Sequence, residues 1–514
     1  GGVMSALLIR GGVLYPADHT DRVVPDGAVL VEDSVIVAAG PAAEVEAAVE
    51  PRHRADLRTI DARDRMILPG FVNAHWHEMF AMRFPFKGAL RSATDRDDKP
   101  VFMALGGDVT QISVVFDAFH DHIDRLTPDE ALAIARYSMW TQLRSGVTTL
   151  GDVGSLNKPQ ALARAARDLG MRCTVSTWAA DTVCHPADSR FRRTRDTDLE
   201  LQRIEELLEE CAGDPEGLVR AWPTSVYGTN MSDELAAGFA DLAARYDVPF
   251  ATHVGALRNE ADVMLAYYGA TPVRRFAEAG LLSDRFMAVH CGFADPGERA
   301  LLIGAGAHIS HSPAKYGQAG ESTVSETRVI PEFRRAGLDV SVSTDGAAVP
   351  LGGMPEAMRA VWQLYNEMYA DPTEVLPTDA LAMATRLPAR GLDQAGRIGS
   401  LEAGKQADLL LVPAEDWRYL LNPRPLEGFL SLGGSMDVET VIVAGQVLIE
   451  DGRSTGLDED ALEAEYLEAL SSFTVRCLGV DADAVGAALR RRGEVVDRRR
   501  RAAAAHHTGW RNGR

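Results

Sequence analysis

The 514-residue sequence has few cysteines and lacks long apolar runs, which argues against a disulfide-stabilised protein and against a membrane-spanning protein. No run reaches the roughly 18 apolar residues of a membrane span, and the start at Met4–Arg10 lacks the charged and apolar regions of a secretory signal. The five cysteines form no Cys-x-x-Cys pair, which argues against a disulfide framework and against a structural zinc cluster. We therefore expect reduced thiols and a cytoplasmic protein with no membrane partner.

The sequence also lacks an excess of positive charge. It has 53 Lys and Arg residues against 74 Asp and Glu residues, so the net charge is -21 at pH 7. This charge would repel a phosphate backbone, and we expect no nucleic-acid partner. The basic runs at 490–492 and 498–501 are expected to form a solvated or frayed end. A hydrophobic fraction of 46% and a charged fraction of 25% are typical of a folded globular protein.

The apolar pattern changes twice along the chain. Short strands separated by turns are predicted near the N-terminus and again late in the sequence, at 6–10, 27–32, 34–38, 409–412 and 438–448. From Met66 onward, an apolar strand, a loop and a long amphipathic helix alternate, which is typical of the βα units of a parallel barrel. Helical segments are predicted again after Asp451.

We predict an α/β protein built on a distorted (β/α)₈ TIM barrel over residues 67–397. A small composite β-sandwich domain is predicted from both chain ends, 1–66 and 398–455, followed by a helical extension with a basic tail, 456–514. The barrel strands are predicted at 66–74, 147–151, 172–178, 218–224, 249–253, 286–290, 308–311 and 339–344. Helices are predicted at 129–145, 198–211 and 232–246.

Two histidines stand at the end of the first barrel strand. In Ile67-Leu-Pro-Gly-Phe-Val-Asn-Ala-His75-Trp-His77 they are two residues apart, so strand alternation points both imidazoles into the barrel lumen. Two converging neutral imidazoles suit Zn²⁺ or Fe²⁺. Such a pair also arises by chance, so the prediction of a metal site depends on the other strands.

Three later strands end in residues that can bind a metal or move a proton: His253, His290 and Asp345. The C-terminal ends of all strands of a (β/α)₈ barrel meet at one face, so residues distant in the sequence become neighbours there. Together with the histidine pair, these residues predict a metal centre at that face.

Several stretches resemble the amidohydrolase superfamily, and within it the mononuclear aromatic-deaminase and triazine-hydrolase (chlorohydrolase) branch. They are PGFVNAHWH (69–77), SGVTTLGD (145–152), SDELAAGFADLAARYDVPFATHV (232–254), VHC (289–291), STDGAA (343–348) and RIGSLEAGKQADLLLV (397–412). The resemblance implies that His75, His77, His253 and Asp345 bind one divalent metal, Zn²⁺ or alternatively Fe²⁺. It places His290 near the metal-bound water, and it implies a homo-oligomer, either a homodimer or a tetramer.

The chemistry of these residues agrees with that implication. A divalent ion lowers the pKa of bound water, so hydroxide becomes available near neutral pH. Asp345 would orient the water and accept its proton, while His290 would polarise the electrophilic carbon or its developing anion. Superfamily members with two metals usually carry a bridging lysine on the fourth strand. Residues 218–224 contain no lysine, so one metal is predicted.

The predicted function is hydrolysis of a C–N bond, not a peptide bond, in a cyclic nitrogen heterocycle. Deamination by a metal-bound hydroxide is the leading reaction, acting on a small planar substrate. The alternatives are hydrolysis of a cyclic amide or another leaving group, and a metal-dependent lyase or decarboxylase on the same scaffold. A non-catalytic scaffold protein is disfavoured because all four candidate ligands are present.

One residue departs from the pattern of the deaminase branch. A glutamate usually follows the third metal-binding histidine by three residues and shuttles a proton, but Ala256 stands there. Alanine cannot transfer a proton, so another group performs this step or the reaction does not need it. Glu78, directly after the histidine pair, is the candidate replacement and is predicted to contact the substrate. Glu260 is expected to be too remote and to lie on the surface.

The loops at the predicted mouth supply further candidates for substrate contact. His311 and Lys315 lie where the superfamily more often has an asparagine-containing loop, and they are predicted to contact an anionic or carbonyl group of the substrate. The long first βα loop carries several phenylalanines, which are expected to stack on a flat ring: Phe80, Phe84, Phe86 and Phe102.

Overall fold

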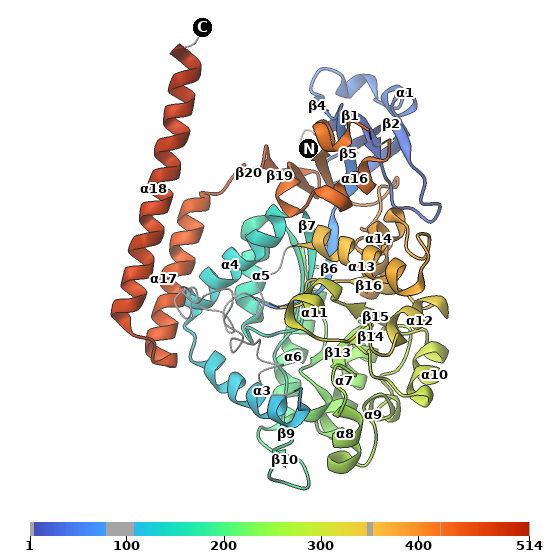
Figure 1. The fold of residues 1–514 in the computed structure, drawn as a ribbon, viewed down its shortest axis with the longest axis vertical. Helices are drawn as coiled ribbons and strands as arrows, with labels where there is room; N and C mark the ends of the chain where they lie inside the picture. Colours follow the sequence, from blue (N-terminus) through green and yellow to red (C-terminus); the bar gives the residue numbers. More distant parts are fainter. Residues whose placement is uncertain (1–4, 79–106, 347–352, 422, 513–514) are drawn as a thin grey trace.

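The computed structural model describes residues 5–78, 107–346, 353–421 and 423–512. The architecture is α/β and has two main parts, a sheet made from both ends of the chain and a set of parallel strands covered by helices (Figure 1). Two long C-terminal helices lie along one side of these parts (Figure 1).

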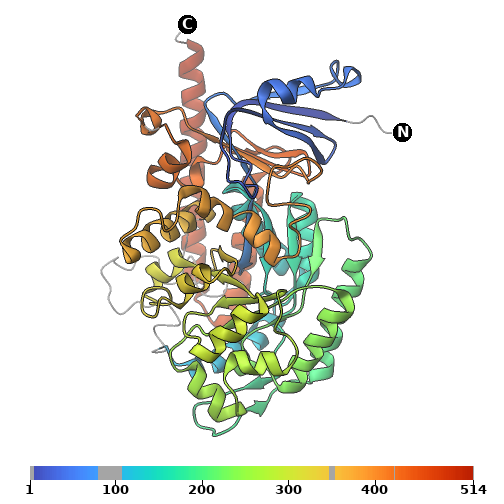
Figure 2. The same ribbon diagram turned by 90° about the vertical axis from the view of Figure 1, so that its right-hand side faces the viewer.

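The sheet at the chain ends contains nine strands among the described residues. Its order is β20-β19-β18-β17-β5-β1-β2-β3, with β4 paired to β1. The two chain ends meet where β17 runs antiparallel to β5, with Leu411 opposite Ile67, and they lie side by side in Figure 2. The strands are β1 (Ala6–Leu14), β2 (Val24–Glu32), β3 (Val35–Pro41), β4 (Arg58–Asp61), β5 (Arg65–Pro69), β17 (Leu409–Pro413), β18 (Thr440–Val443), β19 (Gln446–Glu450) and β20 (Arg453–Ser454).

The central strands run parallel and neighbour one another in chain order. A four-stranded sheet has the order β11-β8-β7-β6, and a five-stranded sheet has the order β12-β13-β14-β15-β16. The strands are β6 (Phe71–Trp76), β7 (Val147–Asp152), β8 (Arg172–Val175), β11 (Val219–Ala221), β12 (Thr224–Ser225), β13 (Phe250–Val254), β14 (Phe286–His290), β15 (His308–His311) and β16 (Val340–Val342). Each predicted barrel strand overlaps a strand of these sheets, and those at 286–290 and 308–311 have the predicted limits. The strand predicted at 218–224 is divided between β11 and β12, which lie in different sheets.

Helices follow the central strands, and local capping explains where several of them begin. At α4 the Thr127 side chain accepts from the Glu130 amide, the Glu130 carboxylate accepts in return, and Pro128 occupies the first turn. The helices near the parallel strands are α3 (Val109–Asp124), α4 (Pro128–Arg144), α5 (Pro159–Leu169), α6 (Thr197–Ala212), α7 (Asp233–Tyr246), α8 (Glu260–Tyr268), α9 (Pro272–Glu278), α10 (Pro296–Ala305), α11 (Pro313–Ala319), α12 (Val329–Arg335), α13 (Met354–Tyr369), α14 (Pro377–Met383) and α15 (Arg386–Gly391). The predicted helices at 129–145, 198–211 and 232–246 are confirmed as α4, α6 and α7.

Smaller elements complete the described chain. A short hairpin pairs β9 (Thr182–Val183) with β10 (Arg192–Arg193). The helix α1 (Ala42–Ala47) packs on β2 and β3 of the nine-stranded sheet, and α16 (Pro425–Leu432) packs on α13 and α14. Single 3₁₀ turns occur at Pro51–His53, Gly228–Asn230, Trp417–Tyr419 and Ser435–Asp437.

The prediction of one continuous strand over 66–74 is wrong. The first half, β5, belongs to the nine-stranded sheet, and the second half, β6, begins the parallel strands. The change of sheet occurs at Gly70, where a Cβ atom would lie 2.1 Å from the Thr148 Oγ1 atom. A glycine is needed for this close approach, and the apolar run that crosses it conceals the bend in the sequence.

The first and last parallel strands of the set come together. The amide of Asp345, just after β16, donates to the carbonyl of His75 in β6 at 3.2 Å, and Trp76 forms an isolated parallel bridge with Asp345. His75 and Asp345 are 270 residues apart in the sequence, and this contact makes them neighbours at the ends of two strands. Such proximity is expected where the strand ends of a barrel meet at one face.

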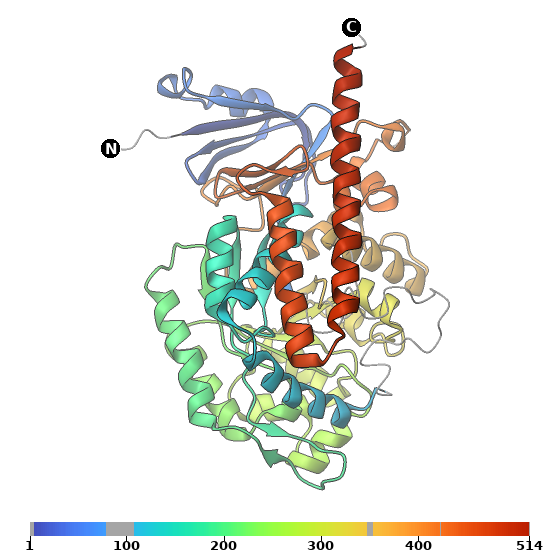
Figure 3. The same ribbon diagram turned by 90° about the vertical axis from the view of Figure 1, so that its left-hand side faces the viewer.

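The C-terminal helices α17 (Glu459–Leu478) and α18 (Ala482–Asn512) form an antiparallel pair, with α17 packed on α4 (Figure 3). The basic runs lie within α18, where Arg492 pairs with Glu463 and Arg500 pairs with Asp460. The prediction of a solvated or frayed end is confirmed in that most arginines of these runs are exposed, but this part is helical rather than frayed, and acidic residues of α17 pair with two of the arginines. No helix in the described part of the chain is long and apolar enough to span a membrane.

Candidate functional site

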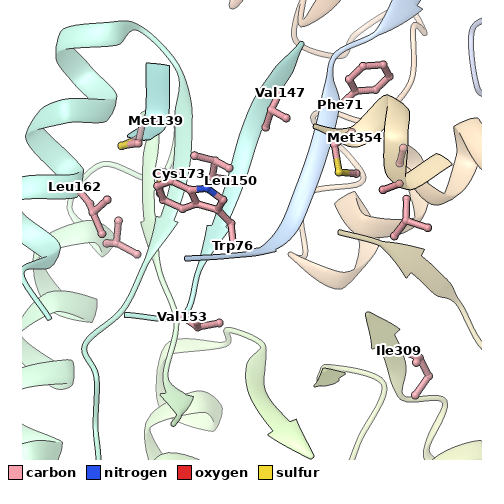
Figure 4. Close-up of a cluster of buried hydrophobic side chains, with 14 of the residues drawn as sticks. Phe71, Trp76, Met139, Val147, Leu150, Val153, Leu162, Cys173, Ile309 and Met354 are labelled. Carbon is pink, nitrogen blue, oxygen red and sulfur yellow. The ribbon is translucent and has the colours of Figure 1, made fainter. Parts of the chain in front are cut away.

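His75 lies near the end of β6 and His77 directly follows the last residue of this strand, as the sequence predicts. His75 is fully buried, and the side chain of His77 is 17% exposed. Trp76 points the other way and packs near Leu150 and Cys173 in the core (Figure 4). Strand alternation therefore gives the two histidines a common direction, opposite to the hydrophobic layer that anchors the strand.

His253 at the end of β13 joins this pair. Its Nδ1 atom is 2.7 Å from the Val226 carbonyl, so Nδ1 carries the proton and donates, and Nε2 keeps its lone pair. That Nε2 atom lies 3.4 Å from the Nε2 atom of His77. Burial lowers the pKa of both His75 and His253, so these imidazoles are neutral near pH 7 and can act as ligands.

Asp345 supplies a carboxylate on the opposite side of the cluster. Its Oδ1 atom lies 3.2 Å from His75 Nε2 and 3.3 Å from His77 Nε2. The backbone of Asp345 has φ +59°, a left-handed conformation that few residues other than glycine adopt. Such backbone conformations concentrate at functional sites, where surrounding contacts hold them in place.

The spacing of these donor atoms fits a single small metal ion. Four ligands about 2.0 to 2.1 Å from a tetrahedral ion lie about 3.3 to 3.4 Å from one another. In this cluster Asp345 Oδ1 lies 3.2 and 3.3 Å from the Nε2 atoms of His75 and His77, and the Nε2 atoms of His77 and His253 are 3.4 Å apart. His75, His77 and His253 also form a group whose ligand atoms all lie within 4.8 Å. The residues present therefore fit a divalent metal of the zinc type.

His290 lies beside the cluster at the end of β14. Its Nε2 atom is 3.5 Å from Asp345 Oδ2, the carboxylate oxygen that does not face His75 and His77. Its Nδ1 atom forms a short hydrogen bond with the Tyr316 hydroxyl. Burial lowers the pKa of His290 well below its usual value, and its backbone also has a left-handed φ of +76°. A neutral imidazole thus faces the second oxygen of Asp345.

Lys315 brings a positive charge to the same oxygen. Its Nζ atom is 3.5 Å from Asp345 Oδ2 and 2.6 Å from Glu321 Oε2. Burial lowers the pKa of Lys315, but the two carboxylates outweigh this and raise it above the ordinary value. For Asp345, burial alone would raise the pKa of the carboxyl group. The Lys315 ammonium and hydrogen bonds from His75 and His77 outweigh burial and hold this pKa well below its usual range.

Glu78 is buried in the structure and is not a solvated loop carboxylate. Its Oε2 atom accepts from the Ser155 hydroxyl at 2.5 Å, while Oε1 has no partner among the described residues. Burial and the neighbouring Glu78 carboxylate raise the pKa of Asp152 well above its usual value. Two carboxyl groups therefore lie together beside the histidine pair, and substrate contact by Glu78 stays a prediction.

His311 has no free ring nitrogen. Nδ1 lies 2.7 Å from the Ser341 carbonyl, and Nε2 lies 2.8 Å from the Tyr365 hydroxyl. Burial lowers the pKa of His311 to about 4, so the ring is neutral at physiological pH. Contact with the substrate stays a prediction, and it would require His311 to exchange one of these two bonds.

The expected surface position of Glu260 is wrong. Glu260 is 1% exposed, and its Oε2 atom accepts from the Tyr227 hydroxyl at 2.7 Å and from the Ala256 amide at 2.9 Å. The chain turns back between β13 and α8, which places Glu260 against the backbone of Ala256 despite the distance in sequence. Burial raises the pKa of this carboxyl to about 7.

We expect Glu260→Gln to change how stability depends on pH. The folded state alone holds the proton between the ordinary pKa of 4.5 and about 7, so the wild type loses stability as pH rises through this window. The loss amounts to about 3 kcal/mol at most. The variant cannot ionise, so its Tm relative to wild type should rise between pH 5 and pH 8 in calorimetry. An equal difference in Tm at both pH values would contradict the raised pKa.

An aromatic wall that the sequence did not predict borders the cluster. The Trp178 ring lies 6.3 Å from the His77 ring, and Phe116 lies 5.4 Å from Trp178 at 90°. Trp178 stands at the end of a predicted strand, a position that could have marked it as a residue of the mouth. No feature of the sequence marked Tyr316, whose hydroxyl contacts His290, as a residue of the site. The phenylalanines of the first βα loop lie outside the described residues: Phe80, Phe84, Phe86 and Phe102.

These features define a class of protein: parallel βα units with three histidines and one aspartate converging at strand ends, as in metal-dependent hydrolases. The model of the Amidohydrolase family matches residues 66–448. The chain belongs to the amidohydrolase family, so the predicted superfamily and the prediction of a hydrolytic enzyme are confirmed. Membership also implies a TIM-barrel-like α/β fold.

Individual relatives agree with this assignment. A 5-methylthioadenosine/S-adenosylhomocysteine deaminase from Symbiobacterium thermophilum is 30% identical over 475 residues, covering 91% of this chain and 98% of the relative. An adenosine deaminase from Xanthomonas campestris with bound zinc has a TM-score of 0.76 at 24% identity, covering 92% and 99% of the two chains. An atrazine chlorohydrolase from Arthrobacter aurescens with zinc has a TM-score of 0.74 at 26% identity, covering 90% and 100%. These relatives agree with metal-dependent hydrolysis of a heterocycle.

Proposed function

We propose that this enzyme removes an exocyclic amino group from a nitrogen heterocycle, with an adenine-type nucleoside as the leading substrate class. The observation that carries the proposal is the convergence of three histidines and Asp345 at metal-ligand spacing, with His290 on the outer oxygen of Asp345. The substrate class is supported by the Symbiobacterium relative, which is named a deaminase of adenosine derivatives.

His75, His77, His253 and Asp345 would hold one divalent metal, Zn²⁺ in our proposal and Fe²⁺ as the alternative. The His₃Asp donor set suits either ion. When bound, the ion supplies Lewis acidity and makes water more acidic near neutral pH. Zinc is favoured by the two zinc-containing structures that this chain resembles.

Asp345 and His290 would handle the protons and the developing charge. Asp345 Oδ2 accepts a proton from the attacking water, and the low pKa of Asp345 keeps this oxygen ionised until then. In this proposal Tyr316 would donate to His290 Nδ1, and the imidazole proton would stand on Nε2, the nitrogen that faces Asp345. That N–H would stabilise negative charge on the substrate as the tetrahedral centre forms.

A second reaction is favoured by Ala256. An amine leaves as ammonia only after it is protonated, whereas chloride leaves without a proton. The absence of a carboxylate at position 256 therefore fits hydrolysis of a leaving group such as the chloride that an atrazine chlorohydrolase would release. Cyclic amide hydrolysis and lyase or decarboxylase chemistry remain further alternatives.

A product assay separates these reactions. The zinc-loaded enzyme, incubated with adenine nucleosides, guanine, cytosine and aminotriazines, is expected to release ammonia from at least one compound. A parallel series of chlorotriazines is assayed for chloride. Ammonia release supports deamination; chloride release without ammonia would establish the second reaction; carbon dioxide or an alkene product from these compounds would exclude both.

The finer architecture is also a proposal. The contact between Trp76 and Asp345 supports closure of the two parallel sheets into one (β/α)₈ barrel over 67–397. A hydrophobic cluster that includes Leu7, Ile9, Leu409 and Leu411 supports a β-sandwich formed from 1–66 and 398–455, with 456–514 as the extension. We further propose a homodimer, on the basis of the family resemblance alone, and a cytoplasmic location, on the basis of the sequence features given above.

A further inference from the structure

The indole of Trp178 is held rigidly beside a candidate metal ligand. Trp178 follows β8, is 2% exposed, and meets the His77 ring edge-on at 6.3 Å and 70°. Phe116 and Phe119 of α3 contact the same indole at centroid distances of 5.4 and 5.9 Å, both nearly perpendicular. An aromatic side chain fixed by two further rings has little freedom to reorient.

The indole N–H of Trp178 has no hydrogen-bond acceptor among the described residues. Two other tryptophans show the usual arrangement. Trp222 Nε1 donates to the Asp152 carbonyl at 2.8 Å, and Trp140 Nε1 donates to the Ser454 hydroxyl at 2.9 Å. Folded proteins pair the great majority of buried N–H groups, so an unpaired one beside a candidate catalytic centre points to a partner that arrives with the ligand.

We propose that Trp178 Nε1–H donates a hydrogen bond to a ring nitrogen of the bound heterocycle, and that it selects substrates carrying such an acceptor. The inference rests on the proposed function, because it concerns the substrate of the same site. An indole N–H can only donate, so it favours an azine nitrogen and disfavours a C–H or N–H at that edge of the ring. A site that buries an unpaired donor discriminates strongly against analogues that cannot satisfy it.

Trp178 is a specificity-determining residue in this proposal. It lies beside His77, whereas His290 and Lys315 approach the outer oxygen of Asp345. The two sides of the site would therefore perform different tasks. His290 acts on the reacting carbon, and Trp178 fixes the orientation of the ring that carries it.

The test pairs a protein substitution with substitutions in the substrate. Trp178→Phe removes the N–H and keeps an aromatic ring, and Trp140→Phe is the matched control that removes a paired indole far from the site. Both variants and the wild type are assayed with adenosine for kcat/KM, and with 1-, 3- and 7-deazaadenosine as competing ligands for their inhibition constants. Each deaza analogue replaces one ring nitrogen by C–H.

Trp178→Phe is expected to lower kcat/KM for adenosine by about 10- to 100-fold. It should leave the inhibition constant of one deaza analogue unchanged, because that analogue already lacks the acceptor. Trp140→Phe should leave all values near wild type. An equal loss with adenosine and all three analogues would overturn the inference and assign Trp178 to packing.

If the wild type itself does not act on adenosine, the same comparison is made with the compound hydrolysed in the product assay and its C–H analogues. Failure of every panel compound with the wild type would instead refute the proposed function, and the inference with it.

Discussion

Asp345→Asn is expected to lower kcat by about 10³-fold or more while the protein stays folded. The amide oxygen of asparagine can occupy the position of Oδ1, which lies within 3.3 Å of His75 and His77. The amide nitrogen would replace Oδ2, and it cannot accept a proton from water. The substitution thus preserves the shape of the cluster and removes the base.

The surroundings of Asp345 make this loss hard to compensate. Lys315 and His290 both approach Oδ2 at 3.5 Å, and the Lys315 ammonium helps to keep the pKa of this carboxyl low. In the variant, the Lys315 ammonium would face an amide N–H₂ group. Both groups donate hydrogen bonds and neither can accept one, so the contact would be unfavourable. KM should change much less than kcat, because the missing step is the proton transfer.

The control for this prediction lies on the same strand. Asp339 precedes β16 at the end of the strand away from the cluster and pairs with Arg390 at 3.3 Å. Asp339→Asn should keep a kcat near that of wild type. Circular dichroism and metal content are measured for both variants, since a folded, metal-containing Asp345→Asn with normal kcat would refute the proposed base.

His75→Ala is expected to abolish metal retention and activity together. The wild type should contain about one metal ion per chain by plasma mass spectrometry, and the variant less than about one tenth of that, because one of the four candidate ligands is lost. His75 is fully buried, and its Nε2 atom is 3.2 Å from Asp345 Oδ1, so the substitution removes a donor atom from the centre of the cluster.

His308→Gln serves as the matched control for the metal measurement. His308 is buried at the opposite end of β15, and its Nε2 atom bonds to the Ser341 hydroxyl at 2.7 Å. This variant should keep the metal. The same analysis distinguishes Zn²⁺ from Fe²⁺. A wild type that binds no metal even after reconstitution would remove the basis of the proposed hydrolysis.

The central strands and their last residues could be predicted because the relevant signals are local. Each strand is a short apolar run, and the residues that end β13, β14 and β16 follow directly from such runs: His253, His290 and Asp345. The repeating βα pattern then predicts that these ends share one face. The three histidines and Asp345 are brought together in the structure as that reasoning requires.

Features that depend on how the chain turns in three dimensions could not be predicted from local residue patterns. The bend at Gly70 lies inside an unbroken apolar run, and only the close approach of Thr148 explains it. Glu260 has the sequence context of an exposed helix start. Its burial follows from the way α8 packs against Tyr227 and the Ala256 backbone.

The sequence by itself determined the α/β class and the set of candidate metal ligands, because both follow from periodicity and from the residues at strand ends. Only the tertiary structure decided which polar groups meet. In the structure both nitrogens of His311 are hydrogen-bonded, Lys315 and Tyr316 lie beside Asp345 and His290, and the Trp178 indole N–H has no partner among the described residues. The physical reason is that hydrogen bonding, burial and pKa depend on distances between segments far apart in the chain, which local residue patterns do not encode.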